Sequence, residues 1–377
     1  MKQLATILCL FGFIYFGTQT TGQNTKIPPV LISVTKILYN MQDLRYFGFQ
    51  FSQDSRAFYS GSIRDRSSAV RKNTVYYKYS SETGKHLETF NLPCFEDGSF
   101  LLDKTERFIY SKCINTKFVP YISKKDHLGS FDRKENKIRW LKDFEFPYDG
   151  GNLGALHLSS DGRYIIGTWG FILDSATGEQ IRNFHSVNTN GNELYFDFAP
   201  NSQIFAVNQF FEGENYVSIF SINTGKVIKN ISNYGMTYNQ FDFSPDSQTI
   251  ATYSKFTRKS ITSPQEYNKV TFWSTQTGLQ TDFITDPCPV QVRVEYHPSG
   301  KYLYTFCPMP DKEDTPNNII RLWNLKTKKS LVVAKDLLHG FTPIYAISPD
   351  GKRLMYATGD PKNQKYFLKI IVVDVLP

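Results

Sequence analysis

The sequence predicts an all-β fold: a seven-bladed β-propeller whose blades are four-stranded antiparallel sheets. Three observations carry this prediction. A pair of short apolar strands around a polar turn recurs seven times along the 377 residues, at intervals of 40 to 56 residues. A second turn between apolar strands follows most copies. Aromatic residues are abundant, with 31 Phe and 23 Tyr, and 24 Gly and 18 Pro supply turns, a composition typical of β-sheet. Repeated four-stranded units of this length are typical of propeller blades.

The first segment of the chain is an export signal rather than part of the fold. Residues 1–22 combine Lys2, an apolar run of 13 residues and a small polar end, which is typical of a secretory signal peptide. The run is shorter than the roughly 20 residues that a membrane-spanning helix needs. We expect cleavage near Gly22, a linker over 23–32 and one propeller domain over 33–377. The protein should then be secreted or periplasmic, with no membrane span. A buried first helix is the alternative interpretation.

Each copy of the first hairpin is organised around an apolar anchor residue directly before its turn. The residues two before and seven after each anchor are apolar in every copy, and this period-two spacing predicts a hairpin with one packed face. Three residues after each anchor stands a short polar side chain, which we expect to hydrogen-bond the turn backbone. The anchors are Phe51, Leu102, Leu158, Phe198, Phe243, Tyr296 and Ile347.

The second hairpin of each copy has a turn such as Ser-Ala-Thr-Gly (175–178), and the seventh copy lacks it because the chain ends first. The seventh blade therefore needs a fourth strand from elsewhere. Leu38 lies 13 residues before the anchor Phe51, which is about the distance between fourth strands and the following anchors in the other copies. The segment 33–40 should pair with 367–373 and close the ring, which leaves no sheet edge open.

The repeats resemble a known family of propellers. Residues 270–278 (VTFWSTQTG) and 319–327 (IRLWNLKTK) resemble the third strand of WD-repeat blades, with Trp273 and Trp323 at the position of that family's tryptophan. The turns of the Ser-Pro-Asp-Gly type are also similar to the repeats of TolB-like propellers. The resemblance covers residues 33–377 and implies the propeller fold.

The sequence departs from the WD pattern at two points. Ser274 and Asn324 follow the tryptophans where the family has Asp, and no regular Gly-His precedes the first strand. We therefore expect the family's Asp–His–Ser–Trp hydrogen-bond network to be absent. The resemblance implies no particular partner, because one fold hosts many functions.

Four cysteines remain after the signal peptide, and an even number in an exported protein predicts disulfides. Cys94 and Cys113 lie 8 before and 11 after one anchor, and Cys288 and Cys307 lie at the same offsets from another. The predicted bridges are Cys94–Cys113 and Cys288–Cys307, each within its own blade. Two pairs of free, buried thiols are the alternative. A four-Cys zinc site is disfavoured, because the pairs lie in distant blades without the short spacing of zinc ligands.

The connections divide into two groups, which predicts two different faces. The turns between the first and second strands and between the third and fourth are uniformly short, and they define a plain face. The other connections vary in length and define a variable face, where a rigid scaffold usually carries its binding residues. The candidate binding residues there are Arg64, Arg66, Arg71, Lys72, Trp169, Lys255 and Arg258. For any single loop, a solvated spacer is the alternative.

A second set of candidates lies one residue before the anchors of four successive blades: His157, Asp197, Asp242 and Glu295. Polar groups on successive inner strands could line a binding or catalytic site at the central channel. The favoured alternative is that they hydrogen-bond between blades, because buried carboxylates need partners.

No nucleophile, metal or phosphate-binding motif occurs in the sequence, so we expect no cofactor and no metal. The net charge of +8 over 377 residues is too dilute to indicate a nucleic-acid partner. The main hypothesis is a non-enzymatic binding scaffold, a monomeric propeller that recognises a protein or a glycan. The alternative is a lactonase- or hydrolase-like propeller enzyme. One N-glycosylation sequon, Asn230-Ile231-Ser232, lies on a predicted outer strand and has meaning in a eukaryotic source.

Overall fold

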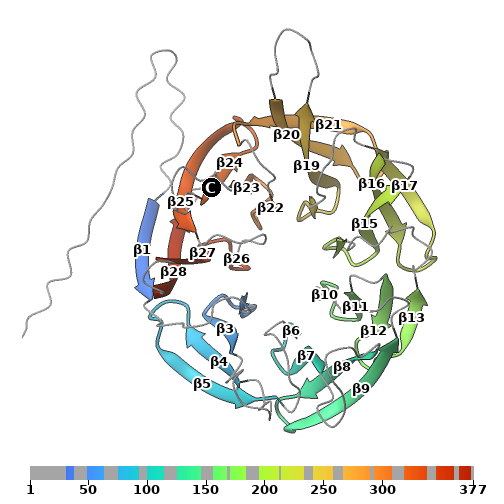
Figure 1. The fold of residues 1–377 in the computed structure, drawn as a ribbon, viewed down its shortest axis with the longest axis vertical. Coiled ribbons are helices and arrows are strands. Elements are labelled where there is room, and N and C mark those ends of the chain that lie inside the picture. Colours follow the sequence, from blue (N-terminus) through green and yellow to red (C-terminus); the bar gives the residue numbers. More distant parts are fainter. Residues whose placement is uncertain are drawn as a thin grey trace, which may run out of the picture.

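The strands form a ring of seven blades around one axis (Figure 1), so the predicted all-β, seven-bladed propeller is confirmed. The structure is a computed structural model. It describes residues 31–37, 49–62, 75–92, 100–113, 125–145, 156–167, 170–183, 195–211, 214–232, 241–257, 266–288, 293–307, 318–337, 345–360 and 365–374. The predicted signal peptide lies outside these ranges.

Each blade runs from a short inner strand, through a second and a third strand, to an outer strand. The inner strands are β2 (Phe49–Phe51), β6 (Phe100–Leu102), β10 (Leu156–Leu158), β14 (Phe196–Phe198), β18 (Phe241–Phe243), β22 (Arg293–Tyr296) and β26 (Tyr345–Ile347). The second strands are β3 (Ala57–Ser62), β7 (Phe108–Cys113), β11 (Tyr164–Gly167), β15 (Ile204–Phe211), β19 (Thr249–Thr257), β23 (Tyr302–Cys307) and β27 (Arg353–Asp360). The third strands are β4 (Val75–Ser80), β8 (Lys125–Asp132), β12 (Phe171–Asp174), β16 (Glu214–Ser221), β20 (Glu266–Ser274), β24 (Asn318–Asn324) and β28 (Lys365–Asp374). The outer strands are β5 (His86–Asn91), β9 (Lys137–Glu145), β13 (Gln180–Asn183), β17 (Val227–Ser232), β21 (Gln280–Asp286), β25 (Lys329–Leu337) and β1 (Leu31–Ile37).

Blades 1 to 5 are separate four-stranded sheets, while blades 6 and 7 join through one residue pair, Leu337 opposite Thr358. In blade 7 the outer position is taken by β1, which runs antiparallel along β28 from Leu31 opposite Asp374 to Ile37 opposite Leu368. Of the segment 33–40 expected to pair with 367–373, residues 33–37 pair with 368–372, and residues 38–40 lie outside the described residues. That β1 holds the ring closed stays a prediction.

The core is divided among the seven boundaries between neighbouring blades. Each boundary has its own cluster of buried apolar side chains. At the boundary that joins the last blade to the first, Phe58 and Tyr79 of blade 1 pack with Met355, Leu368 and Ile370 of blade 7. Successive residues of one strand pack into different boundaries, because Phe58 joins the cluster shared with blade 7 and Tyr59 joins the cluster shared with blade 2. Each blade is therefore apolar on both faces and must be covered on both sides.

The turns between inner and second strands share one backbone geometry. In all seven, the side chain three residues after the anchor accepts a hydrogen bond from the backbone N–H two residues further on, as for Asp246 and Gln248 at 3.0 Å. The predicted role of this polar position is therefore confirmed. The following residue is left-handed in every copy, with φ between 53° and 76°, and it is Gly in three copies and Ser in three others.

The tryptophans of blades 5 and 6 form equivalent hydrogen bonds. The indole Nε1 of Trp273 donates to Thr252 Oγ1, and that of Trp323 donates to Thr305 Oγ1, both at 2.9 Å. Each bond links the third strand to the second strand of the same blade.

Candidate functional site

The candidate site is the group of polar side chains on the inner strands that surround the axis (Figure 1). His157 lies on β10, Asp197 on β14, Asp242 on β18 and Glu295 on β22. In the β14 and β18 sequences Phe-Asp-Phe, the flanking phenylalanines are buried between blades while the aspartate stays partly exposed. Strand alternation therefore places the aspartates on the opposite face of the strand from the phenylalanines, toward the next blade.

Asp242 is engaged between blades. Its Oδ2 accepts a hydrogen bond from the backbone N–H of Tyr296, the anchor of the next blade. Gln50 holds the equivalent position in blade 1 and does the same, because its Oε1 accepts from Leu102 N at 2.9 Å and its Nε2 donates to Leu102 O. These two side chains therefore form hydrogen bonds between blades, as the favoured interpretation of the sequence predicted.

His157 and Asp197 also meet across a blade boundary. The Nδ1 of His157 lies 3.4 Å from Asp197 Oδ1, and each side chain is about a quarter exposed. The His157 ring packs edge-on against Tyr195, with 5.8 Å between ring centroids. This pair positions the imidazole beside a carboxylate, but no hydroxyl or thiol nucleophile pairs with it within the described residues.

Arg293 is a member of this group that the sequence reasoning missed. Its Nη2 lies 3.3 Å from Glu295 Oε2 on the same strand, and its guanidinium stacks over the Tyr345 ring of blade 7 at 4.6 Å. The signal was available, because Arg293 lies two residues before Glu295 and residues two apart on a strand share a face. One cation thus partly balances the carboxylates around the axis.

Two carboxyls of this group, Asp242 and Glu295, are shifted toward their neutral forms. Burial raises the pKa of the Asp242 carboxyl well above its ordinary value, and the nearby Asp197 and Glu295 charges raise it further. Burial also raises the pKa of Glu295, which the Arg293 charge opposes. Carboxyls in such surroundings can store a proton, as general acids do. Among the residues that the structure describes, no group of three His, Cys, Asp or Glu side chains is arranged to hold a metal ion.

The loop candidates fall mostly outside the described residues. This applies to Arg64, Arg66, Arg71, Lys72, Trp169 and Arg258. Lys255 lies on β19 opposite Asn268. The structure therefore brings together the four inner-strand candidates, with Arg293 added.

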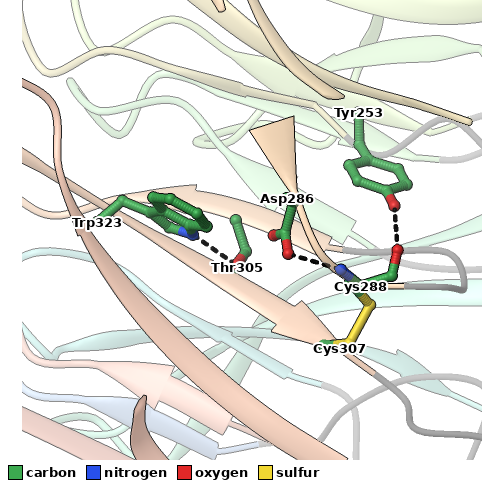
Figure 2. Close-up of a disulfide and its surroundings, with 6 residues drawn as sticks. All are labelled: Tyr253, Asp286, Cys288, Thr305, Cys307 and Trp323. Carbon is green, nitrogen blue, oxygen red and sulfur yellow. Dashed lines mark hydrogen bonds between the residues drawn. A yellow bond between two sulfur atoms is a disulfide. The ribbon is translucent and has the colours of Figure 1, made fainter. Parts of the chain in front are cut away.

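One of the two predicted disulfides is present. Cys288 and Cys307 are bonded, with 5.7 Å between their Cα atoms (Figure 2), and both are buried. Asp286 Oδ1 accepts from the backbone N–H of Cys288 at 3.0 Å and fixes this turn of the chain. Cys94 lies outside the described residues, and Cys113 is the last residue of β7; their pairing stays a prediction.

The position of the bridge differs from the prediction of a bond within one blade. Cys288 follows β21, the outer strand of blade 5, whereas Cys307 ends β23 of blade 6. Both cysteines belong to the apolar cluster between blades 5 and 6. The sequence reasoning assigned Cys288 to the blade of the anchor Tyr296, eight residues later, whereas in the structure Cys288 lies directly after the outer strand of the preceding blade. The bridge therefore fastens two blades together.

The described part of the chain contains no helix of the length and apolar character that crossing a membrane requires. No protein-family model matches the sequence, and no curated protein matches it.

Proposed function

We propose that the protein is an exported, non-enzymatic binding scaffold that presents the variable face of its propeller to a protein or a glycan. The observation that carries the proposal is the engagement of the inner-strand polar groups. Asp242 and Gln50 bond to the backbone of the next blade, and His157 is paired with Asp197. Groups held in this way stabilise the ring rather than await a substrate.

The plain face supports the same proposal, because its turns are joined to one another. Asp161 N donates to Ser202 Oγ, and Asn201 N donates to Ser247 Oγ, each at 3.0 Å from one blade to the next. A face whose polar groups are used internally is a poor recognition surface. The connections of the opposite face differ in length from one repeat to the next, and such loops on a rigid frame are the usual place for binding.

The proposal also covers the kind of propeller and the compartment in which the protein works. The Trp273–Thr252 and Trp323–Thr305 hydrogen bonds support a place among the WD-repeat-like propellers. The signal-peptide pattern of residues 1–22 and the buried Cys288–Cys307 bridge support export, because structural disulfides persist in oxidising compartments. We propose a secreted or periplasmic protein.

The binding proposal is tested by site-directed photocrosslinking with the full chain in medium or envelope extract of its source. Benzoylphenylalanine is placed at Arg66, Arg258 or Glu313 on the variable-face connections, and at Gln276, which is exposed in a plain-face turn, as the matched control. We expect the same crosslinked protein or glycoconjugate from the variable-face positions, removed by excess unlabelled chain. Absence of crosslinks at all three positions, or equal crosslinking from Gln276, would contradict the proposal.

The second candidate function is a hydrolase or lactonase that uses the carboxyls around the axis. The raised pKa of Asp242 and of Glu295 favours it, because a general acid must hold a proton near neutral pH. A panel of lactones and aryl esters should show no turnover above the uncatalysed rate. If turnover were found and Asp242→Asn or Glu295→Gln abolished it, the enzyme would be favoured over the binding scaffold.

Asp242→Asn is a suitable variant because an amide oxygen can still accept from Tyr296 N. Since the folded state holds the Asp242 pKa above its ordinary value of 3.8, the charged carboxylate costs stability as the pH rises above 3.8. The amide carries no charge, so we expect Asp242→Asn to melt at the same or a higher temperature than the wild type at pH 7. A large drop in melting temperature would show that the negative charge itself holds the blades together.

A further inference from the structure

We infer that Asn230 is an N-glycosylation site and that its glycan covers the outer edge of blade 4. The inference goes beyond the proposed function and rests on the export that the proposal includes. Asn230-Ile231-Ser232 is the one Asn-X-Ser/Thr sequon in the 377 residues, and its middle residue is not proline, as N-glycosylation requires. The sequon alone leaves open whether the asparagine is accessible in the fold.

The structure places this asparagine on an outermost strand. Asn230 lies on β17, and the sheet order β14-β15-β16-β17 ends there. Along that strand Ile231 is fully buried toward blade 5, while Asn230 is exposed. Strand alternation thus places Asn230 on the face of blade 4 opposite to Ile231, where its side chain is exposed.

The asparagine side chain is held in a way that a glycan would preserve. Its Oδ1 accepts a hydrogen bond from Ser218 Oγ at 2.8 Å. Attachment of a sugar replaces one hydrogen on Nδ2 and leaves Oδ1 untouched, so the bond to Ser218 survives modification. The attached sugar would start from a positioned amide at the rim of the propeller.

The modification transfers an oligosaccharide from a lipid-pyrophosphate donor to the nascent chain. A bond forms between Asn230 Nδ2 and the anomeric carbon of the first sugar, while the anomeric C–O bond to the pyrophosphate breaks. Nδ2 loses one proton and the lipid pyrophosphate leaves with the bonding electron pair. The hydroxyl group of Ser232 is the second feature that the transfer recognises.

A glycan at this position would cover apolar surface that is otherwise open to solvent. Val227 and Ile228 on the same strand are 48% and 42% exposed. An outer strand with exposed apolar side chains is a site for unwanted edge-to-edge pairing, which a bulky hydrated glycan blocks.

The test is carried out on the full chain recovered from its own source. The peptide containing Asn230 is analysed by mass spectrometry before and after peptide-N-glycosidase, which converts a glycosylated asparagine to aspartate. We expect a glycan on this peptide and conversion at position 230. An unmodified Asn230 peptide in the exported protein would overturn the inference, whatever the crosslinking experiment shows.

Three variants distinguish loss of the sequon from loss of the fold. In a glycosylating eukaryotic host, Ser232→Thr should keep the glycan, whereas Ser232→Ala and Asn230→Gln should abolish it. All three should be secreted and should melt as folded proteins. A glycan that persists on the Ser232→Ala variant, or no glycan on wild type and Ser232→Thr alike, would contradict the assignment.

Discussion

In three of the turns between inner and second strands, a serine follows the polar turn residue. At this serine an unfavourable backbone conformation is opposed by a hydrogen bond to the neighbouring blade. Ser247 has a φ of 62°, a left-handed conformation that costs a residue with a Cβ about 1 kcal/mol or more. Its hydroxyl accepts a hydrogen bond from Asn201 N of the preceding blade at 3.0 Å, and its side chain is buried. Ser202 and Ser55 repeat this arrangement at other boundaries. The interblade bond explains why serine occupies a position that backbone geometry would give to glycine.

Two substitutions at Ser247 separate these effects. Ser247→Ala removes the acceptor of Asn201 N and keeps the backbone cost, so we expect a loss of about 1–3 kcal/mol. Ser247→Gly removes the acceptor and the backbone cost together, so we expect a smaller loss. Urea unfolding measures both. A glycine variant less stable than the alanine variant would contradict this account.

His297 is a buried histidine that joins the plain-face turns of blades 6 and 7. Its Nε2 donates to Gly351 O at 2.9 Å, and its Nδ1 accepts from Ser299 N at 3.1 Å, which defines the neutral tautomer. The rings of Tyr302 and Tyr304 flank it. Burial lowers the pKa of His297, an effect that the Gly351 carbonyl and the Asp350 charge oppose. If Nδ1 were protonated, it could no longer accept the hydrogen bond from Ser299 N, and two N–H donors would face each other.

The stabilisation that neutral His297 gives the ring should therefore decrease in mild acid. Because the folded pKa of His297 lies below its ordinary value of 6.5, the unfolded chain binds the proton first. The stabilisation is complete above pH 6.5 and is lost as the pH falls through the folded pKa. We expect the melting temperature of the wild type to fall relative to that of His297→Gln between pH 7 and pH 5, because the raised pKa values of Asp242 and Glu295 act in the opposite direction equally in both proteins. His297→Gln can keep the bond to Gly351 O but does not titrate.

That comparison isolates the histidine, since both proteins share every other titrating group. Equal slopes of melting temperature against pH for wild type and His297→Gln would assign the acid sensitivity to other groups.

At the scale of elements, neighbouring blades are joined by contacts of different kinds. Apolar clusters lie at every boundary, but the Cys288–Cys307 bridge reinforces the boundary between blades 5 and 6. Tyr253 of blade 5 contributes a hydroxyl that reaches Cys288 O at 3.5 Å (Figure 2). The bridge thus ties the end of an outer strand to the second strand of the next blade, beside the variable face.

Removal of this bridge should destabilise the fold measurably. For a sequence separation of 19 residues, the chain-entropy model gives about 3 kcal/mol. We expect Cys288→Ala/Cys307→Ala to lower the free energy of unfolding by roughly that amount in urea. The double alanine variant at Cys94 and Cys113 is the matched comparison for the second predicted bridge.

Non-reducing peptide mapping of the exported protein provides the covalent check. Peptides joining Cys288 to Cys307 and Cys94 to Cys113 are expected. Four alkylatable thiols, or a peptide that joins one pair to the other, would contradict the pairing.

At the scale of the whole molecule, the ring depends on the boundary between the last blade and the first. The apolar cluster there joins blades 7 and 1, and Asp350 N donates to Ser55 Oγ at 3.0 Å across 295 residues of sequence. Strand β1 adds a fourth strand to blade 7 along seven residue pairs from Leu31 to Ile37. This pairing covers the outer edge of β28, which would otherwise be open.

We predict that β1 is needed for cooperative unfolding. Deletion of residues 23–40 removes the strand and should lower the melting temperature and broaden the transition, because blade 7 loses its outer strand. Deletion of 23–30 alone keeps Leu31–Ile37 and serves as the matched control. An unchanged melting temperature in the longer deletion, measured by calorimetry, would show that the apolar cluster closes the ring without β1.

The sequence by itself determined the features that depend on neighbours along the chain. Period-two spacing around anchors such as Phe243 sets which residues are buried, and the polar residue three positions on, such as Asp246, bonds its own turn. Seven copies of this pattern established the number of blades, and equal offsets paired Cys288 with Cys307. These properties could be predicted because short-range hydrogen bonds and strand alternation follow directly from residue order.

Only the tertiary structure decided which groups meet across blade boundaries. The bond from Tyr296 N to Asp242 spans 54 residues, and Arg293 stacks on Tyr345 of the next blade. The same holds for the blade to which Cys288 belongs and for the exposed position of Asn230. Alternation gives each side chain a face of its own sheet. The partner on that face is set by how neighbouring sheets twist and pack around the axis, and that packing is a property of the closed ring.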